Sequence, residues 1–423
     1  MSDSSTRHLY LTWPLLLGMG LLMLGAGLQG TLIGLRATLE GFPTLVIGAV
    51  MSCYYVGYIA GSFATSELVQ RVGHIRVFAA LTAVASVTIL LQAVFVTPAI
   101  WALLRLASGF CFAGIYIVAE SWLNDRATNQ NRGGVLAVYM LVLYIGLGSG
   151  QFLLNAADPA GPLLFLLTSV MISIAVVPMS LSVQRAPEFH HVQRIRLTEL
   201  FHVSPMGVVG VIVSGILTGA LFSIGPVYAN LIGLNATDVA TFMGVSILAA
   251  VLTQLPIGRV SDRMDRRSML MIVCTLAALF ATAAAVVGTM SKVLLFLLAA
   301  SFGGIALTLY SLSLSHINDH LDPKQMVSAS ASVILLNGAG SVAGPVLFSL
   351  LIVAFGPAAY FGGMAALTGT LGLYALWRKG QAAPVPAGLK VPFVGAQPQA
   401  VSGQLVAEAA QDMAVAREDG VTA

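Results

Sequence analysis

Hydrophobic positions fill long unbroken stretches of this chain, and polar positions gather in the connections between them. A helix needs about 20 consecutive apolar residues to cross the hydrocarbon core of a bilayer. The pattern predicts twelve helices of that kind, at residues 13–35, 44–68, 77–96, 98–122, 134–156, 161–183, 207–230, 239–257, 269–290, 293–315, 328–354 and 357–377. We therefore expect an all-α integral membrane protein with twelve transmembrane helices.

The longest connection lies in the middle of the chain and divides the predicted helices six and six. Within it, the stretch 194–201 is amphipathic, which predicts a short helix at the membrane surface. After Lys379 the sequence becomes rich in Ala, Pro, Gly, Gln and Val, so we expect a disordered tail. The expected units are an N-terminal segment (1–12), two six-helix bundles (13–183 and 207–379), the linker between them (184–206) and the tail (380–423).

Composition agrees with a membrane protein, because 57% of the residues are hydrophobic and only 9% are charged. Soluble domains carry about 25% charged residues. Of the 20 Lys and Arg residues, 17 fall on the side of the predicted bundle that carries the N-terminus. Cytoplasmic connections are enriched in these residues, so both termini are predicted to be cytoplasmic, in a bacterial inner membrane.

An internal repeat relates the two predicted bundles. The segment Gly258-Arg-Val-Ser-Asp262-Arg263-Met-Asp-Arg266-Arg267 follows the eighth helix, and the weaker Arg71-Val-Gly73-His-Ile-Arg76 follows the second, at an offset of 192 (263 − 71). Gly146-Leu-Gly-Ser aligns with Gly338-Ala-Gly-Ser at 192, and Ser121-Trp-Leu-Asn-Asp125 with Ser315-His-Ile-Asn-Asp319 at 194. Both bundles have an even number of helices, so the repeats are parallel, related by an axis along the membrane normal.

These motifs resemble the major facilitator superfamily over about residues 1–380. Arg71 to Arg76, Glu120-Ser-Trp-Leu-Asn124, Arg132-Gly-Gly, Gly150-Gln151 and Pro256-Ile-Gly-Arg259 are similar to its YcaD-like branch. The resemblance implies two pseudo-symmetric six-helix bundles that transport an unassigned small molecule. Three positions depart from the superfamily pattern, namely Gln70 for an acidic residue, Asp265 for a glycine, and a fifth helix without the Gly-Pro of drug antiporters.

Charged residues beside the connections are expected to form a gating latch. Asp262 can pair with Arg263, Arg266 or Arg267 and with a helix N-terminus, and Glu67 can replace the missing acid at Gln70. The alternative is that these arginines serve only to orient the chain in the membrane. The predicted latch residues are Arg71, Gly73, Arg76, Asp125, Arg132, Gly258, Asp262, Arg263, Arg266, Arg267 and Asp319.

Arg105 and Glu120 are ionisable residues within the fourth predicted helix. Charges in the membrane interior are costly and usually functional. Arg105-x-x-x-Gly109 resembles a superfamily motif whose arginine faces the central cavity, so we expect a role in substrate or proton coupling, with a structural anchor as the alternative. Glu120 is expected either to pair with Arg71, Arg126 or Arg132, or to carry a proton.

The resemblance also implies which helices line the central cavity. Polar and aromatic candidates on those helices are Gln29, Arg36, Tyr116, Ser214, Thr218, Phe222, Tyr310 and Asn337. His316 ends the tenth helix and is a second candidate for proton coupling, because histidine titrates near neutral pH. The alternative is an ordinary interfacial histidine.

We expect a secondary transporter that moves a small molecule by alternating access, with protons as a candidate coupling ion and export slightly favoured over import. The scarcity of central acids suits neutral, aromatic or anionic substrates better than organic cations. The alternative is a membrane sensor or scaffold whose tail binds a partner. The sequence contains no nucleotide-binding glycine loop, metal-ligand cluster or nucleophile–base pair, so we expect no enzymatic activity, cofactor or metal. We also expect a monomer in the lipid bilayer, without a nucleic-acid partner.

Overall fold

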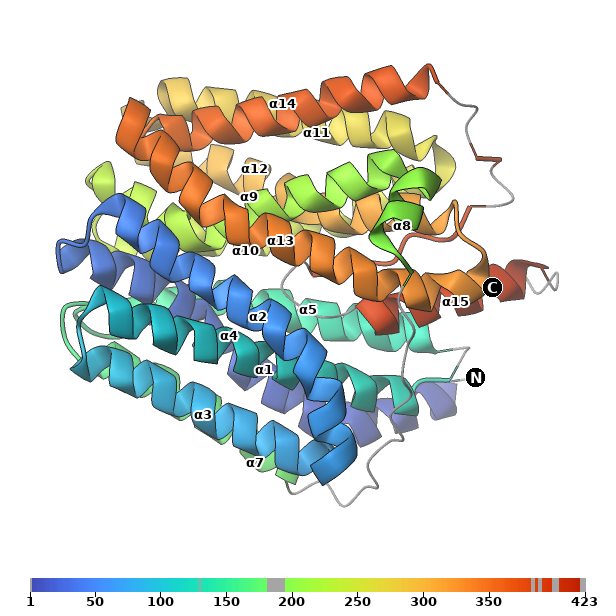
Figure 1. Cartoon of the computed structure of the whole chain (residues 1–423), viewed down its shortest axis with the longest axis horizontal. Coiled ribbons are helices and arrows are strands. Elements are labelled where there is room, and N and C mark those ends of the chain that lie inside the picture. Colours follow the sequence, from blue (N-terminus) through green and yellow to red (C-terminus); the bar gives the residue numbers. More distant parts are fainter. Residues whose placement is uncertain are drawn as a thin grey trace.

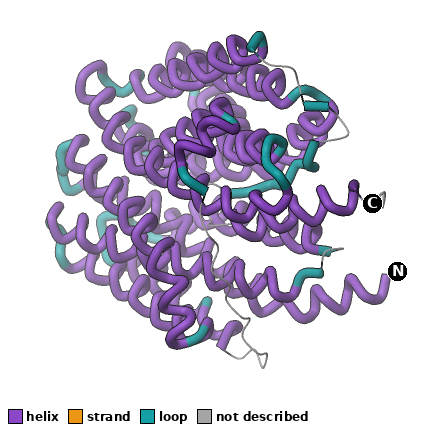
Figure 2. Tube along the Cα trace, turned by 45° about the vertical axis from the view of Figure 1, so that its right-hand side comes forward, coloured by secondary structure: helices purple, strands orange, loops and turns teal. Residues whose placement is uncertain are grey.

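The computed structural model describes residues 2–128, 131–180, 195–381, 385–386, 390–397 and 403–418. Within these residues the chain forms helices and loops, without a strand (Figure 2). The first bundle contains α1 (Ser2–Leu39), α2 (Thr44–Val72), α3 (His74–Val94), α4 (Pro98–Arg126), α5 (Arg132–Gly150), the 3-10 turn η1 (Gln151–Ala156), α6 (Leu163–Ile174) and α7 (Val176–Ser180). The second contains α9 (Pro205–Leu231), α10 (Ala236–Arg263), α11 (Arg266–Val287), the 3-10 turn η2 (Gly288–Met290), α12 (Lys292–Asn318), α13 (Pro323–Phe355) and α14 (Ala359–Lys379). Two short helices lie outside the bundles, α8 (Leu197–Val203) and α15 (Gly403–Glu418).

The two bundles lie side by side, with their long helices running in roughly the same direction (Figure 1). The start of α1 and the short helices α8 and α15 lie at the same end of the molecule (Figure 1). We call this end the termini side and the opposite end the far side. The loops α2–α3, α4–α5, α10–α11 and α12–α13 lie on the termini side.

Each of the twelve predicted apolar stretches corresponds to a long helix or to a helix with a short continuation. Eleven of these are long and apolar enough to cross a membrane. The remaining one, α14, has 21 residues, but its glycines and threonines and the terminal Arg378 and Lys379 lower its hydropathy. It packs along α11, as α6 packs along α3 in the first bundle, so it completes the second bundle.

Glycines bring the first and fifth helices of each bundle into backbone contact. A Cβ at Gly27 of α1 would overlap the carbonyl oxygen of Leu147 on α5. A Cβ at Gly219 of α9 would likewise overlap the carbonyl oxygen of Ser341 on α13. The equivalent positions differ by 192 in the first helices (219 − 27) and by 194 in the fifth (341 − 147).

The contacts correct the register of one predicted alignment. Gly150 packs on the carbonyl oxygen of Leu24, and its counterpart on Ile216 is Gly344, again at 194 (344 − 150) and 192 (216 − 24). The predicted match of Gly146 with Gly338 at 192 is therefore off by two residues. The error arose because glycines recur at short spacing in both helices, so a shifted alignment matches almost as many of them.

The tail differs from the expected disorder. Residues 390–397 run between the two bundles from the termini side, and α15 lies against α13, α4 and α5. Val391, Val394 and Ala396 are buried, as are Val406, Ala407, Ala409 and Ala410 on one face of α15. Composition alone did not predict this burial, because the tail has few apolar side chains and the two bundles cover them. Residues 382–384, 387–389, 398–402 and 419–423 of the predicted tail and residues 184–194 of the linker lie outside the described residues. The helix α8 overlaps the predicted surface helix (194–201) and continues two residues beyond it.

Candidate functional site

A small cavity lies at the centre of the molecule, between α1, α2, α4, α5, η1 and α9. Its volume is about 40 Å³, enough for roughly two or three water molecules. Four of the predicted substrate residues line it: Gln29, Arg105, Tyr116 and Phe222. Most of the lining comes from the first bundle, and the second contributes Phe222 and Ser223 from α9.

Among the described residues that line this cavity, Arg105 is the only charged one. Its side chain is 5% exposed, and its Cζ atom lies 4.4 Å from the centre of the Tyr54 ring. Within the described part of the chain it forms no ion pair, and its Nε atom has no hydrogen-bond partner. The ring face stabilises the guanidinium by a cation–π interaction, but a buried charge without a counter-charge remains costly. The site therefore favours an anionic or electron-rich guest beside Arg105.

The polar groups around Arg105 are neutral and mostly bonded to each other. Gln29 donates to Ser108 Oγ at 3.2 Å, and Thr31 donates to Gln151 Oε1. Gln151 in turn donates to the carbonyl oxygens of Gly27 and Leu147 at 2.9 and 3.1 Å. These bonds fix the amide orientations, so the neutral polar groups that line the cavity with Arg105 are held in place.

The other predicted substrate residues lie elsewhere. Arg36 pairs with Glu40 at 2.5 Å near the far side. Asn337 donates to the carbonyl oxygen of Val211 at 3.1 Å, within the contact of α13 with α9. His316 is buried near the termini side, with its ring 4.7 Å from that of His320. Tyr310, Ser214 and Thr218 are buried without lining the cavity.

Glu120 is buried on α4, 15 residues after Arg105 (120 − 105), which is about 22 Å along the helix. Tyr139 donates a hydrogen bond of 3.3 Å to its Oε1 atom. None of the three arginines expected to pair with it does so, because Arg71 pairs with Glu67 and Arg132 turns to α15. In the described residues Arg126 also makes no ion pair with Glu120. The Glu120 carboxyl group is therefore buried in the bundle, and the Tyr139 hydroxyl donates a hydrogen bond to it.

Arg266 is the centre of the latch in the second bundle, where it contacts Asp262 and Asp319. Its side chain is 1% exposed, and its Nε atom lies 2.5 Å from Asp319 Oδ2. The other two nitrogens donate to Ser261 at 3.0 Å and to Asp262 at 3.2 Å. The predicted pairing of Asp262 is thus made with Arg266, whereas Arg263 is exposed to solvent.

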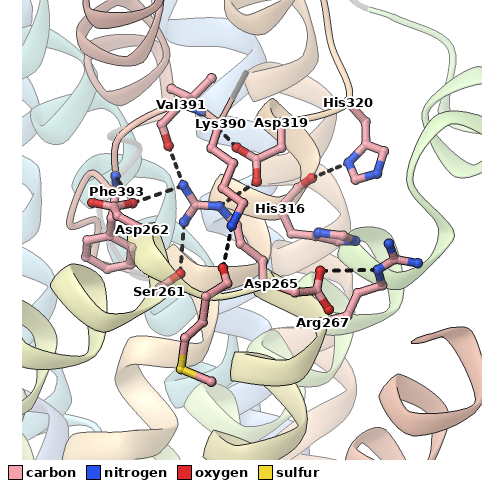
Figure 3. A network of polar contacts seen from close by, with 12 residues as sticks. Ser261, Asp262, Asp265, Arg267, His316, Asp319, His320, Lys390, Val391 and Phe393 are labelled. Atoms are coloured by element: carbon pink, nitrogen blue, oxygen red, sulfur yellow. Dashed lines mark hydrogen bonds and ion pairs between the residues drawn. The ribbon is translucent and has the colours of Figure 1, made fainter. Parts of the chain in front are cut away.

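The tail completes this latch (Figure 3). Val391 accepts a hydrogen bond from Arg266 through its carbonyl oxygen, and its N–H donates to Asp319 Oδ1 at 2.9 Å. The Phe393 N–H donates to Asp262 at 2.8 Å, and Lys390 Nζ donates to the carbonyl oxygen of Met264 at 2.5 Å. Burial raises the pKa of the Asp319 carboxyl, and the Arg266 guanidinium and the Val391 N–H oppose that shift. Both donors therefore favour the charged form of Asp319 against the effect of burial.

Further along, the tail meets both bundles. The carbonyl oxygen of Ala396 accepts from Gln254 at 3.1 Å and from Ser311 at 2.9 Å in the second bundle. It also accepts from Tyr144 Oη at 3.5 Å in the first. Ser311 Oγ additionally receives the Ala396 N–H at 2.9 Å. One peptide unit of the tail is thus bonded to α5, α10 and α12 together.

The remaining latch positions have varied surroundings. Gly258 lies beneath the Phe393 ring, and a Cβ there would overlap it. Gly73 has φ +90° and joins α2 to α3 in a turn that favours glycine. Arg132 binds Asp412 of α15 and lies 3.9 Å from Glu408. Arg71 pairs with Glu67 at the surface, and Arg76 and Asp125 are exposed. Arg267 lies 3.6 Å from Asp265, which also caps α11, so the departure from glycine at this position supplies a helix cap.

Sequence reasoning missed Tyr54, Tyr55, Gln151, Gln254 and Ser311. A signal was available for the two glutamines, since amide side chains are uncommon within membrane helices and usually have a specific partner there. Nothing in the sequence marks which face of α2 carries Tyr54 and Tyr55. Among the described residues, no group of three or more His, Cys, Asp or Glu side chains is arranged to hold a metal ion.

Comparison with known proteins identifies the family. The model of the Major Facilitator Superfamily matches residues 15–277 and 207–409. An uncharacterised MFS-type transporter YcaD of Salmonella newport (strain SL254) is 29% identical over 342 residues, covering 80% of this chain and 88% of the relative. An uncharacterised MFS-type transporter of Enterobacter sp. (strain 638) is 28% identical over 340 residues, with the same coverage.

Two solved structures share the fold. The nucleoside transporter NupG has a TM-score of 0.69 at 15% identity and covers 87% of this chain and 98% of its own. A bacterial homologue of the human lysosomal transporter Spinster, in an inward-facing and unoccupied conformation, has a TM-score of 0.67 at 11% identity and covers 98% of both chains. At these identities the likeness concerns the fold alone. With the family model and the curated relatives, it shows that the chain is a multi-pass membrane transporter of the Major Facilitator Superfamily, in the YcaD-like branch.

Proposed function

We propose that this protein is a secondary transporter that carries a small anionic or aromatic molecule across a bacterial inner membrane by alternating access. The observation that carries the proposal is Arg105, a buried guanidinium at the central cavity with no acidic partner among the described residues. A substrate carboxylate or phosphate would supply the missing counter-charge through a bidentate contact. An aromatic substrate would extend the stack that Tyr54 begins.

The positive-inside bias of the sequence supports a cytoplasmic termini side. On the far side the bundles touch directly, since Gly34 of α1 packs on Pro226 of α9 and Gly48 of α2 packs on Ser349 of α13. On the termini side the tail lies between them. This arrangement supports an inward-facing state, in which the far side is closed. Alternating access then requires the far-side contacts to open and the termini side to close.

Protons are the coupling ion that we propose, because Glu120 is a buried carboxyl group without an ion pair to the nearby arginines. We propose export as the direction. Both parts are tested by a flux assay in everted and in right-side-out vesicles, each with and without a pH gradient. Equal flux under both conditions would exclude proton coupling, and uptake only into right-side-out vesicles would exclude export.

The sensor or scaffold alternative has less support, because the described part of the tail is bound to the chain's own bundles. Transport by the purified protein in liposomes would reject that alternative directly.

The substrate site is tested by ligand-induced thermal stabilisation of the purified protein. The screen contains organic acids, sugar phosphates, nucleosides, amino acids and aromatic drugs. A ligand at a hundredfold excess over its Kd stabilises the folded state by about 2.7 kcal/mol. We expect a hit whose effect is lost in Arg105→Gln and reduced in Arg105→Lys, since lysine keeps the charge but not the planar fork.

The matched control is Arg196→Gln, at the exposed arginine that directly precedes α8, and this variant should bind as the unmodified protein does. A ligand that stabilises the Arg105→Gln variant as well as the unmodified protein would contradict the proposed role of Arg105.

A further inference from the structure

We propose that the C-terminal tail is an intramolecular plug, which occupies the route between the central cavity and the termini side and ties the two bundles together. The inference rests on the proposed transport function, because it assigns a regulatory element to the same site. It requires that the tail lie deep between the bundles, that its contacts be specific, and that it bind both bundles at once.

The depth follows from the partners of Ala396. Gln254 lies nine residues from the termini-side end of α10 at Arg263 (263 − 254). At 1.5 Å per residue this is about 13 Å inside the bundle, close to half the thickness of the hydrocarbon core. Tyr144, the partner in the first bundle, lies one turn from Leu147, which lines the central cavity. Ala396 of the tail therefore reaches to about one helical turn from the residues that line the cavity.

The contacts are specific because they satisfy the backbone of the tail. An unpaired backbone group buried away from water is costly. Here the N–H and C=O groups of Val391 and Ala396 and the N–H of Phe393 all have partners on the bundles. Gly258 leaves room for the Phe393 ring, which no larger residue would. Such a set of matched donors and acceptors is typical of a bound peptide.

The helix α15 extends this binding across the bundles. It packs mainly on α13 of the second bundle and also touches α4 and α5 of the first. Glu408 accepts a hydrogen bond of 2.5 Å from Asn124 on α4, and Asp412 pairs with Arg132 on α5. If one bundle rocked against the other, the contacts of α15 with one of the two bundles would have to break. A docked tail therefore resists the change from the inward-facing to the outward-facing state.

The first experiment asks whether the tail is docked, and it requires no substrate. Gly258→Cys with Phe393→Cys places two thiols where the ring now covers the glycine, within reach of a disulfide. The background lacks Cys53, Cys111 and Cys274, and a protease site is inserted between Gln381 and Lys390. We expect the cleaved tail to remain attached after oxidation and to leave after reduction. Release without reductant, as in the single-cysteine controls, would overturn the docking.

The second experiment asks whether the docked tail blocks the route. A cysteine placed at Ser223 in the same cysteine-free background lines the cavity and is labelled with a membrane-impermeant maleimide from the termini side. If the docked form is populated above about 90%, removing it raises the labelling rate about tenfold. We expect this increase in a chain that ends at Gln381. The full-length Val394→Glu variant, which leaves the bundles unchanged, is expected to behave in the same way.

Equal labelling of the full-length, truncated and Val394→Glu proteins would overturn the plug. Labelling does not depend on transport, so the two proposals fail separately. Faster labelling without flux of any screened ligand would count against the transporter and leave the plug standing, whereas flux with unchanged labelling would do the reverse.

Discussion

At the scale of single residues, Arg105 sets the character of the central cavity, because it is the one charged side chain among the described residues that line it. Gln29, Tyr116 and Phe222 also line the cavity, and Asp262 pairs with Arg266, one of the three arginines predicted for it; a role of these residues in substrate binding or gating stays a prediction. Asn337 lies in the contact of α13 with α9 instead, and its position was hard to predict because α13 is apolar around much of its circumference. In such a helix the sequence carries little periodic signal for the face that meets the cavity.

Gly258 provides a test at this scale. In Gly258→Ala the new Cβ would overlap the Phe393 ring, so the tail is expected to detach and trypsin to cleave after Lys390 several times faster. The measurement is limited proteolysis of the folded protein followed by mass spectrometry. Gly362→Ala in α14 is the control, because nothing lies near the added Cβ.

Removing the ring should restore the fit. The double variant Gly258→Ala with Phe393→Ala is expected to be cleaved more slowly than Gly258→Ala alone. Equal cleavage of the Gly258→Ala and unmodified proteins would mean that the ring does not pack where the structure places it.

At the scale of elements, hydropathy alone predicted the helices, because each membrane-spanning helix must satisfy its backbone internally and cover it with apolar side chains. The tail escaped prediction for a related reason. Its segment 390–397 has too few apolar residues to form a core alone, and it is ordered only through donors and acceptors on α5, α10, α11 and α12. No local property of the segment encodes those partners.

The two acidic residues of α15 that face Arg132, Glu408 and Asp412, provide a test at the scale of elements. Glu408→Gln with Asp412→Asn removes both carboxylates that face Arg132. Hydrogen bonds to charged groups contribute about 1.5–3 kcal/mol each, so hydrogen exchange of the α15 amides should become at least about tenfold faster. Mass spectrometry of the tail peptide measures it. Unchanged protection would show that apolar packing on α13 is sufficient, and Glu199→Gln on α8 should leave α15 unaffected.

At the scale of the whole molecule, the repeat in the sequence predicted two equivalent bundles, and the equivalent glycine contacts bear this out. Their relative placement could not be predicted. Direct contact on one side and a bridging tail on the other describe one arrangement of the bundles, and the proposed alternating access would require the same sequence to adopt a second one.

The far-side contact gives a prediction about that balance. Gly48→Leu places a large side chain against Ser349 and Pro345, so the bundles are expected to separate on the far side. Maleimide labelling of a cysteine at Ser223 from the far side should then increase several-fold. The matched control is Gly362→Leu in the first turn of α14, where nothing lies near an added Cβ, and it tests for general loosening. An increase in both variants would argue against a specific far-side closure.

The tether between α14 and the latch is short, since only ten residues separate Lys379 from Lys390 (390 − 379 − 1). A segment on such a tether has an effective concentration on the order of millimolar at its own binding site. A solute arriving from the termini side must compete with this permanent local ligand, whereas a solute arriving from the far side meets an open cavity only after the bundles have rearranged. The apparent affinity of the carrier for its solute would therefore differ between the two faces. The length of the tether between Lys379 and Lys390 would determine the size of this difference.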